Sequence, residues 1–298
     1  MSGECAVSVA TAFHSGLQRF SHEAMACTWE LFILGEAPGY AAQVAKAAFD
    51  EVDRLERELS RFIPTSDIAR INALRAGQSL RVGSDAFACL EMAKQVHEDT
   101  HGAFDVTVGA LVRPNAAGQM PPAVGMHLLT LDRTAHAVTV QADGLIVDLG
   151  AIGKGYAIDQ VIALLRDWGV RTALLHSGQS TVYALGAPPG QPGWRMALRD
   201  PLDHSAALAG LCLRDQALSG SGTLLHGEHI IDPRTRSAAR GPLGAWAMAD
   251  SATMSDAIST ALMVISPDSL DEFCRNQPML GTFICVAGAG GRGELRSS

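Results

Sequence analysis

The sequence predicts an α+β fold, a single compact unit in which helices and strands both contribute to one core. Some segments repeat apolar residues at the three-and-four spacing of helices, whereas others are short apolar runs bounded by turn residues, as strands are. Of the 298 residues, 47% are hydrophobic, enough to bury a large core without disulfides or metals. No repeat, low-complexity tract or linker divides the chain, although two interleaved lobes would also agree with this pattern.

The first half of the chain is mainly helical. The run TWELFILG predicts a strand over 28–34 that ends at a glycine. Apolar residues from Ala45 to Leu59 recur at helical spacing and predict a helix over 40–59. Ser66 or Asp67 is expected to cap a short helical turn, and a second cap-then-helix signal covers 84–100.

The second half is mainly strand. AVTV (137–140) and LIVDL (145–149), joined by a QADG turn, predict a hairpin. A helix is expected from Tyr156 to Asp167, ending at Gly169. Strands follow over 172–177, 181–186 and 194–200, and a further extended run over 208–222 ends in small residues. SDAISTALMVI (255–265) predicts the last strong helix, before a closing strand over 281–288.

Charge and composition exclude some classes of protein. The formal net charge of -8 and the lack of any Lys/Arg run argue against a nucleic-acid partner. The first 20 residues lack a basic region followed by an apolar one, and no apolar run approaches membrane-spanning length, so we expect a cytoplasmic protein without a transmembrane segment. The cysteines lack metal-binding spacing and are expected to be buried reduced thiols, and the four tryptophans to be core or rim residues.

A glycine-rich corner, VDLGAIGKGYAID (147–159), is the first candidate site. Asp148 is expected to end a strand, and the glycines at 150, 153 and 155 leave N–H groups uncovered at the start of the next helix. Such helix ends attract phosphate, and Lys154 adds a cation. The spacing matches neither a dinucleotide fingerprint nor a Walker loop, so an ordinary tight turn remains the alternative.

Two more candidates carry polar side chains with defined spacing. Asp256 and Thr260 lie four residues apart on a predicted helix, and their oxygens would suit Mg²⁺. Alternatively, Ser255 or Asp256 caps the helix while Thr260 bonds back to a carbonyl. In AFDVTVG, Asp105 and Thr107 would share one side of a short strand, beside a ligand or merely at a strand end.

The fourth candidate is the histidine pair of HGEHIIDPRT (226–235). His229 precedes two β-branched residues and an Asp-Pro turn, and a histidine there could serve as a general base because its pKa lies near neutrality. His226 could compete for this role, and a surface or core histidine is the alternative.

In order and wording, these blocks resemble the FAD:protein FMN transferases, the ApbE-type flavin transferases. The likeness runs from about Phe20 to Val286 through EAMACTWEL, LSRFIPTSDIARIN, GAFDVTVGALV, VDLGAIGKGYAID, ALSGSG, HIIDPRT and SDAISTALMVI. It implies a T-fold-related α+β unit of mixed, largely antiparallel sheets with flanking helices. The implied domain covers 20–290, with tails at 1–19 and 291–298.

The resemblance also implies an activity and a set of site residues. Family members bind FAD as substrate, use Mg²⁺, and move FMN onto a Ser/Thr hydroxyl of an acceptor flavoprotein, releasing AMP. The catalytic base would be His229, and the metal would be held by the Ala151 carbonyl with Asp256 and Thr260. The positions matching FAD-contacting residues are Met25, Phe62, Asp105, Val106, Thr107, Asp148, Lys154 and Ile231.

The chain departs from the family pattern at three places. It has Met25-Ala26-Cys27 where the family commonly reads Met-Gly-Thr, Ser177-Gly178-Gln179 where many members have Gly-Gly followed by an acidic or amide residue, and Leu218-Ser219-Gly220 where Thr-Ser-Gly is familiar. These departures keep a non-catalytic flavin-binding protein open beside transfer. A metal-dependent FAD pyrophosphatase giving FMN and AMP is a second alternative, which the resemblance itself implies.

Overall fold

The computed structural model describes residues 7–9, 16–111, 122–222, 230–266, 269–277, 281–288 and 292–297. Its centre is a sheet of eight strands in which all neighbouring strands are antiparallel. In spatial order the strands are β16 (Gly293–Ser297), β15 (Gly281–Ala287), β14 (Gly244–Ala249), β11 (Gln216–Gly222), β8 (Thr181–Leu185), β7 (Ala173–Ser177), β3 (Cys27–Leu34) and β2 (Leu17–Ala24).

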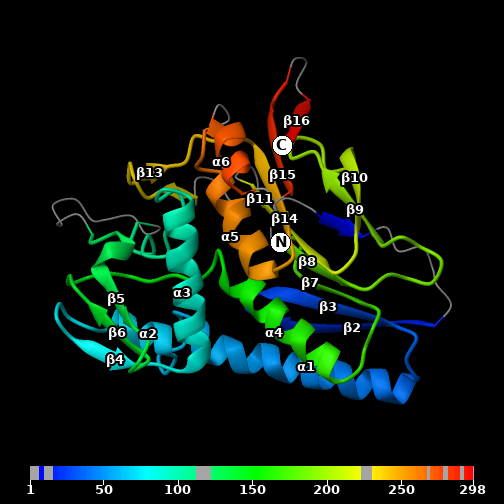
Figure 1. Cartoon of the computed structure of the whole chain (residues 1–298), viewed down its shortest axis with the longest axis horizontal. Helices are drawn as coiled ribbons and strands as arrows, with labels where there is room; N and C mark the ends of the chain where they lie inside the picture. The colour runs from blue at the N-terminus through cyan, green and yellow to red at the C-terminus, as the bar shows by residue number, and fades with distance from the viewer. Residues whose placement is uncertain are drawn as a thin grey trace.

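Helices cover one face of this sheet, as Figure 1 shows. They are α1 (Pro38–Leu59), α4 (Gly153–Asp167) and α5 (Ala252–Leu262), with α3 (Ser84–Asp99) packed on α1 and α5. A smaller sheet of β1 (Val7–Val9), β9 (Trp194–Arg199) and β10 (Ala207–Leu213) accompanies the large sheet. Residues of β9 and β10 share a core cluster with β7, β8 and β11. The large sheet therefore has a core on both faces.

The remaining elements are short. Three strands form a small sheet beside α3: β4 (Ser79–Arg81), β5 (Leu129–Asp132) and β6 (Ala137–Val140). A two-stranded hairpin consists of β12 (Ile231–Asp232) and β13 (Ser237–Ala238). The other helices are α2 (Asp67–Asn72), the 3-10 turn η1 (Met126–Leu128) and α6 (Leu270–Asn276).

The two long helices of the core follow from their patterns. In α1 the predicted apolar stripe is buried against the sheet. Pro38 lies in the first turn, where its missing N–H costs no hydrogen bond because an N–H at that position has no acceptor within the helix. In α5 nearly every residue is buried, because the helix lies between β11 and β14 on one side and α4 on the other. The strands predicted at 28–34, 172–177 and 181–186 and the helices predicted at 40–59 and 84–100 are confirmed within a few residues.

One predicted hairpin is wrong. Strand β6 pairs with β4 and β5, whereas 145–149 is extended without a strand partner, apart from one parallel bridge between Ile146 and Val108. The side chain of Asn72 replaces a strand at this point. Its amide donates to the Val147 carbonyl at 2.9 Å, and its oxygen accepts from the Val147 N–H at 2.7 Å.

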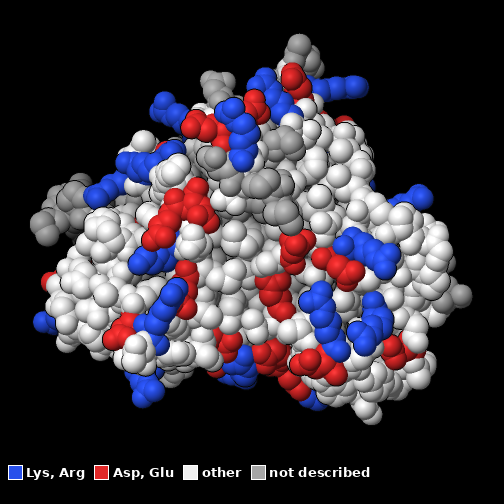
Figure 2. All heavy atoms as spheres, viewed as in Figure 1, with Lys and Arg blue, Asp and Glu red and all other residues white. Residues whose placement is uncertain are grey.

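Along the chain, the strands of the large sheet extend from Leu17, where β2 begins, to Ser297, where β16 ends, and the unit boundaries at 20 and 290 stay predictions. None of the helices in the described ranges has the length and apolar character needed to cross a bilayer. On the face seen in Figure 2, Lys and Arg lie among Asp and Glu instead of forming a continuous basic patch.

The tryptophans are core or rim residues, as expected. Trp29, Trp194 and Trp246 are buried and Trp168 is exposed. The expectation of buried thiols is confirmed for Cys27, Cys89 and Cys285. Cys212 in β10 is exposed and Cys274 is half-buried, whereas Cys5 lies outside the described residues.

Helices α4 and α5 approach so closely at Gly155 that no side chain fits between them. A Cβ atom at this position would lie 2.3 Å from the Ala252 carbonyl oxygen and 2.8 Å from the Asp256 Cβ. A Cβ at Gly153, two residues earlier, would meet only the Leu149 Cβ, at an ordinary 3.5 Å. The contact of α4 with α5 therefore depends on a glycine at 155 but not at 153.

Gly155→Ala is expected to lower the free energy of unfolding by about 1–3 kcal/mol, because forcing the two helices apart outweighs the better helix propensity of alanine, about 1 kcal/mol. Urea unfolding followed by circular dichroism measures the change. Gly153→Ala is the matched control and should leave stability equal or slightly raised. Equal losses in both variants would contradict the close approach.

Candidate active site

Two cavities lie side by side at the glycine-rich corner. The larger, of about 340 Å³, is enclosed by residues of 103–108, the corner itself, the end of β11, the start of the β12–β13 hairpin, and α5. The smaller, of about 150 Å³, lies between the β2–β3 turn, the end of α1 and the same corner. Asp148, Gly150 and Lys154 line both. The corner is thus the common wall of the two cavities.

Most of the residues singled out in the sequence are brought together here. Seven line the large cavity: Asp105, Val106, Asp148, Ala151, Lys154, Asp256 and Thr260. Ile231 joins them from the β12–β13 hairpin. Met25 and Phe62 line the small cavity instead. His229 and its competitor His226 lie outside the described residues.

The corner itself differs from the predicted strand-to-helix join. Helix α4 begins at Gly153, three residues earlier than expected, so Lys154 is in its first turn. Asp148 is extended but not in a strand. Its N–H donates to the Val106 carbonyl at 2.7 Å, and its Oδ1 accepts from the Gly150 N–H at 2.9 Å. The Lys154 ammonium lies 3.3 Å from the Gly150 carbonyl oxygen. The first of these bonds holds the corner against the 105–108 segment, and the other two lie within the corner.

Asp256 is fixed at both of its carboxylate oxygens. Oδ2 accepts from the Gly155 N–H at 3.0 Å, and Oδ1 accepts from the Thr181 hydroxyl at 3.2 Å. Asp256 as a whole is 5% exposed, and it lines the large cavity beside Thr260. Each carboxylate oxygen has a second lone pair, so these bonds leave acceptor capacity toward the cavity.

The alternative interpretation of α5, in which Ser255 or Asp256 caps the helix and Thr260 bonds back to a carbonyl, is partly correct. Thr260 does bond back to the Asp256 carbonyl, at 3.3 Å, and its hydroxyl also lies 3.3 Å from the Ser221 hydroxyl. The helix cap, however, is Ser251, whose Oγ accepts from the Met254 N–H. Ser255 and Asp256 are one turn inside the helix, because α5 starts earlier than its apolar spacing indicates. Asp256 is therefore not needed as a cap.

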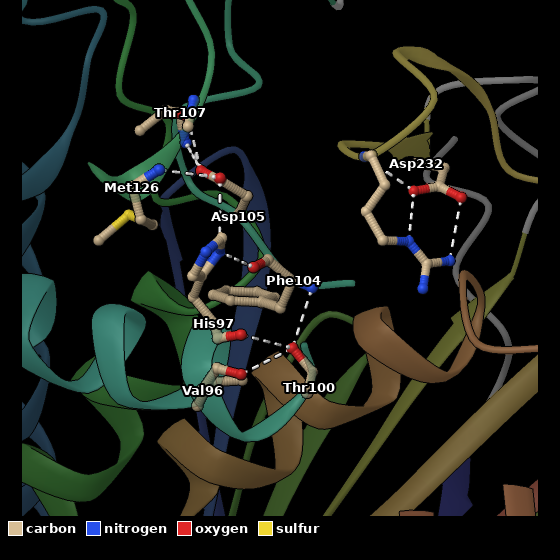
Figure 3. Close-up of polar contacts among 10 residues, drawn as sticks. Val96, His97, Thr100, Phe104, Asp105, Thr107, Met126 and Asp232 are labelled. Carbon is tan, nitrogen blue, oxygen red and sulfur yellow. Dashed lines mark hydrogen bonds and ion pairs between the residues drawn. The ribbon is translucent and has the colours of Figure 1, made fainter. Parts of the chain in front are cut away.

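The prediction that Asp105 and Thr107 share one side of a strand is wrong. They form a turn in which Asp105 Oδ1 accepts from the N–H of Thr107 at 2.8 Å and from its hydroxyl at 2.6 Å. Asp105 Oδ2 accepts from the Met126 N–H and lies 3.4 Å from His97 Nδ1 (Figure 3). Thr107 is fully buried behind the cavity wall, where its hydroxyl also accepts from the Gly125 N–H. The Asp105 side chain thus binds a nearby backbone N–H, and this local bond favours a turn over a strand.

The β12–β13 hairpin divides the large cavity from a hollow on its other side. Ile231 and Pro233 face the large cavity, whereas Asp232 and Arg234 line that second hollow. There the Asp232 carboxylate, labelled in Figure 3, accepts two hydrogen bonds from the Arg234 guanidinium at 3.0 Å. This pairing lowers the pKa of Asp232 against the opposing effect of burial, and raises that of Arg234. The hairpin therefore presents apolar side chains to one cavity and an ion pair to the other.

One largely covered cation beside the corner, Arg61, was not predicted as a site residue, and its side chain is 12% exposed. The Arg61 guanidinium, in the small cavity, lies 3.2 Å from Asp148 Oδ2 as an ion pair without hydrogen-bond alignment, and also donates to the Gly109 carbonyl. It stacks 4.7 Å from the ring centroid of Phe62, which is 71% exposed. The LSRF block contained Arg61, but only burial marks it as more than a surface arginine.

The arrangement offers two kinds of chemistry. The exposed aromatic ring of Phe62 and the apolar Met25 would accommodate a flat ring in the small cavity. In the large cavity, carbonyl, carboxylate and hydroxyl oxygens meet a lysine and the first turn of α4, which suits a hard cation and a phosphate group. Within the described ranges, no group of three His, Cys, Asp or Glu side chains is placed to hold a metal.

A model of the ApbE family matches residues 25–284, which include all of these cavity residues. The chain belongs to the ApbE family. Its likeness to an FAD:protein FMN transferase of Rhodobacter capsulatus is 33% identity over 214 residues, 64% of this chain but only 40% of that protein. To the FAD:protein FMN transferase of Escherichia coli K12 it is 26% identical over 280 residues, 85% of this chain and 80% of that protein.

Solved ApbE structures share the fold of this ApbE-family chain. The flavin transferase ApbE from Vibrio cholerae superposes with a TM-score of 0.83 at 21% identity, covering 95% of this chain and 97% of that one. The flavinyl transferase ApbE of Pseudomonas stutzeri in its apo form gives 0.82 at 23% identity, covering 97% and 96%. The α+β class and the largely antiparallel sheets are thereby confirmed.

The departure at Met25-Ala26-Cys27 has a structural meaning in this ApbE-family chain. Ala24 pairs with Cys27 across a two-residue turn, and both turn residues are left-handed, with φ of 50° at Met25 and 60° at Ala26. Such turns favour glycine, because an L side chain is strained there. Ala26 thus introduces strain at the wall of the small cavity.

Ala26→Gly is expected to raise the free energy of unfolding by up to about 1 kcal/mol. The left-handed strain removed, roughly 1–2 kcal/mol, exceeds the extra chain entropy of glycine, roughly 0.5–1 kcal/mol. Urea unfolding tests this, with Ala42→Gly on the exposed side of α1 as the control of opposite sign. A loss of stability in both variants would show that Ala26 is unstrained.

Proposed function

We propose that this chain is a Mg²⁺-dependent FAD:protein FMN transferase, moving FMN from FAD to a Ser or Thr hydroxyl of an acceptor flavoprotein and releasing AMP. One observation carries the proposal. Ala151 from the glycine corner and Asp256 and Thr260 from α5, about a hundred residues apart in sequence, line a single cavity beside Lys154. Membership of the ApbE family and relatives named FAD:protein FMN transferase support it.

The residues present suit Mg²⁺. The Ala151 carbonyl, the Asp256 carboxylate and the Thr260 hydroxyl would hold the ion through oxygen, leaving its other positions for water and phosphate. When bound, the ion would neutralise charge on the diphosphate of FAD. Asp256 suits this role because Gly155 and Thr181 orient both of its oxygens.

The protein's own groups would share the remaining work. Phosphoryl transfer depends mainly on alignment and charge neutralisation, and Lys154, in the first turn of α4, would supply positive charge from one side. Phe62 and Met25 would hold the flavin ring in the small cavity. Asp105, Val106, Asp148 and Ile231 would contact the rest of FAD in the large cavity, with Thr107 supporting Asp105 from behind. His229 would remove the proton of the acceptor hydroxyl.

The test is an incubation with FAD, Mg²⁺ and a domain carrying an acceptor segment of the Asp-x-Ser/Thr-Gly-Ala-Ser/Thr type. The proposal requires a covalent FMN mass increase on the acceptor and an equal amount of AMP. AMP without the mass increase would identify an FAD pyrophosphatase instead. Tight FAD binding without AMP would identify a non-catalytic flavin-binding protein.

Asp256→Asn is expected to lower Mg²⁺-dependent AMP release by at least about 100-fold, because an amide holds a hard cation far less well than a carboxylate. Chromatographic measurement of AMP gives the rate. Asp167→Asn, at the exposed far end of α4, is the matched control and should keep the wild-type rate. An Asp256→Asn variant with the wild-type Mg²⁺ response would exclude this residue as a ligand.

His229→Ala should abolish transfer to the acceptor while FAD binds as in the wild type, since a base that acts on the acceptor contributes little to FAD affinity. Quenching of flavin fluorescence measures binding, and mass spectrometry of the acceptor measures transfer. His226→Ala is the comparison. If FAD affinity fell together with transfer in the His229 variant, the separate role of a base would be refuted.

A further inference from the structure

The cation site proposed above is built from two helices, so its geometry depends on how α5 sits along α4. The helices touch at Gly155, where even a methyl group is excluded. Ala151 belongs to the corner that opens α4, whereas Asp256 and Thr260 belong to α5. A slide of α5 along α4 would separate these oxygens while leaving each helix intact.

Asp159 is the residue that ties the start of α5 to α4. It lies one turn after Gly155, on the same side of α4. Its Oδ1 accepts from the Ala252 N–H at 2.8 Å, and its Oδ2 accepts from the Thr253 N–H at 2.9 Å. The hydroxyls of Ser251 and Thr253 also donate to Oδ2, at 2.7 and 2.5 Å. One carboxylate therefore receives four hydrogen bonds from the first turn of α5.

These four bonds do more than cap a helix. The first N–H groups of any α-helix lack partners within it, and a carboxylate there is favoured by the helix dipole. Ser251 already caps α5 from its own chain, through the Met254 N–H. Asp159, 92 residues away from Ser251, adds a partner from another helix. The bonds therefore fix where α5 begins relative to α4.

A second attachment lies one turn further along α5. The Gly155 N–H donates to Asp256 Oδ2, so α4 holds α5 at its first turn through Asp159 and at Asp256 through Gly155. Two attachment points on the same pair of helices remove both sliding and rotation. Asp159 lines neither of the two cavities at the corner, so it can act on a bound ion only through α5.

We propose that Asp159 is a positioning residue of the cation site, fixing the register of α5 on α4 so that Asp256 and Thr260 face Ala151. This inference rests on the proposed function, because it takes those three residues as the Mg²⁺ ligands. It assigns to Asp159 an effect on Mg²⁺ affinity, separate from its contribution to folding.

Asp159→Asn tests the proposal. The amide has nearly the same shape, but its NH₂ group cannot accept the bonds now received by one carboxylate oxygen. Two readouts apply: the Mg²⁺ concentration giving half of the metal-induced rise in thermal unfolding temperature, and the concentration giving half-maximal AMP release from FAD. Both are expected to rise about tenfold, the usual effect of losing a group that orients a metal ligand. FAD affinity without Mg²⁺ should stay at the wild-type value.

Thr253→Val is the milder second variant, in case the asparagine protein does not fold. It removes only the hydroxyl donor to Asp159 and should raise both Mg²⁺ concentrations by a smaller factor, about threefold. Asp132→Asn is the matched control, since Asp132 also accepts two backbone N–H bonds but lies at the end of β5 and lines neither cavity. It should leave both concentrations unchanged.

The outcomes separate this proposal from the previous one. Folded Asp159→Asn and Thr253→Val proteins with wild-type Mg²⁺ concentrations would overturn it, as would an equal rise in the Asp132→Asn control. If wild-type protein released no AMP but its unfolding temperature still rose with Mg²⁺, the transferase proposal would fail. The Asp159 proposal would then be decided by the thermal readout alone.

Discussion

The close contact of α4 with α5 is the constraint on which the candidate site depends. At Gly155 the two backbones meet without an intervening side chain, and the Gly155 N–H reaches across to the Asp256 carboxylate. A hydrogen bond to a buried charged group is stronger than one between neutral groups. The same glycine thus permits the helix contact and orients an acidic side chain toward the large cavity.

The surrounding fold keeps this contact in place from both sides. Helix α5 rests on β11 and β14, and its Ser255 hydroxyl donates to the Ala247 carbonyl in β14 at 2.7 Å. Helix α4 is bound to α3 through the Tyr156 hydroxyl, which donates to Asp85 at 2.8 Å. Burial and this carboxylate raise the pKa of Tyr156 above its ordinary value. Packed helices and strands therefore support the side of the large cavity that α4 and α5 form.

The sequence predicted the elements with strong local signals and failed where partners were distant. The stripe of α1 and the apolar strands β3, β7 and β8 are recognisable from neighbouring residues alone. The fate of 145–149 depended on Asn72, which is 75 residues away from Val147, and no periodicity records such a bond. Asp105 likewise fits a strand by local pattern, but in the structure its carboxylate accepts from the Thr107 N–H and forms a turn.

The residues of the candidate site could be named from the sequence because they stand in short blocks that together resemble a known family, and the structure places most of them around two cavities. The sequence blocks do not show that these residues are divided between two cavities. They also do not show that Thr107 is buried behind the wall of the large cavity instead of lining it. Arg61 was not predicted because arginine is usually a surface residue. Only its low exposure beside Asp148 distinguishes it from an ordinary surface arginine.

The alternation along β12 has an evolutionary consequence. Ile231 and Asp232 point to opposite sides of a hairpin only two pairs long, in register with Ala238 and Ser237. Deleting or inserting a single residue upstream in this strand would exchange the two sides and turn a carboxylate toward the large cavity. Length changes among descendants of this chain should therefore accumulate at the hairpin tip, between Pro233 and Arg236, and be purged from the strand itself.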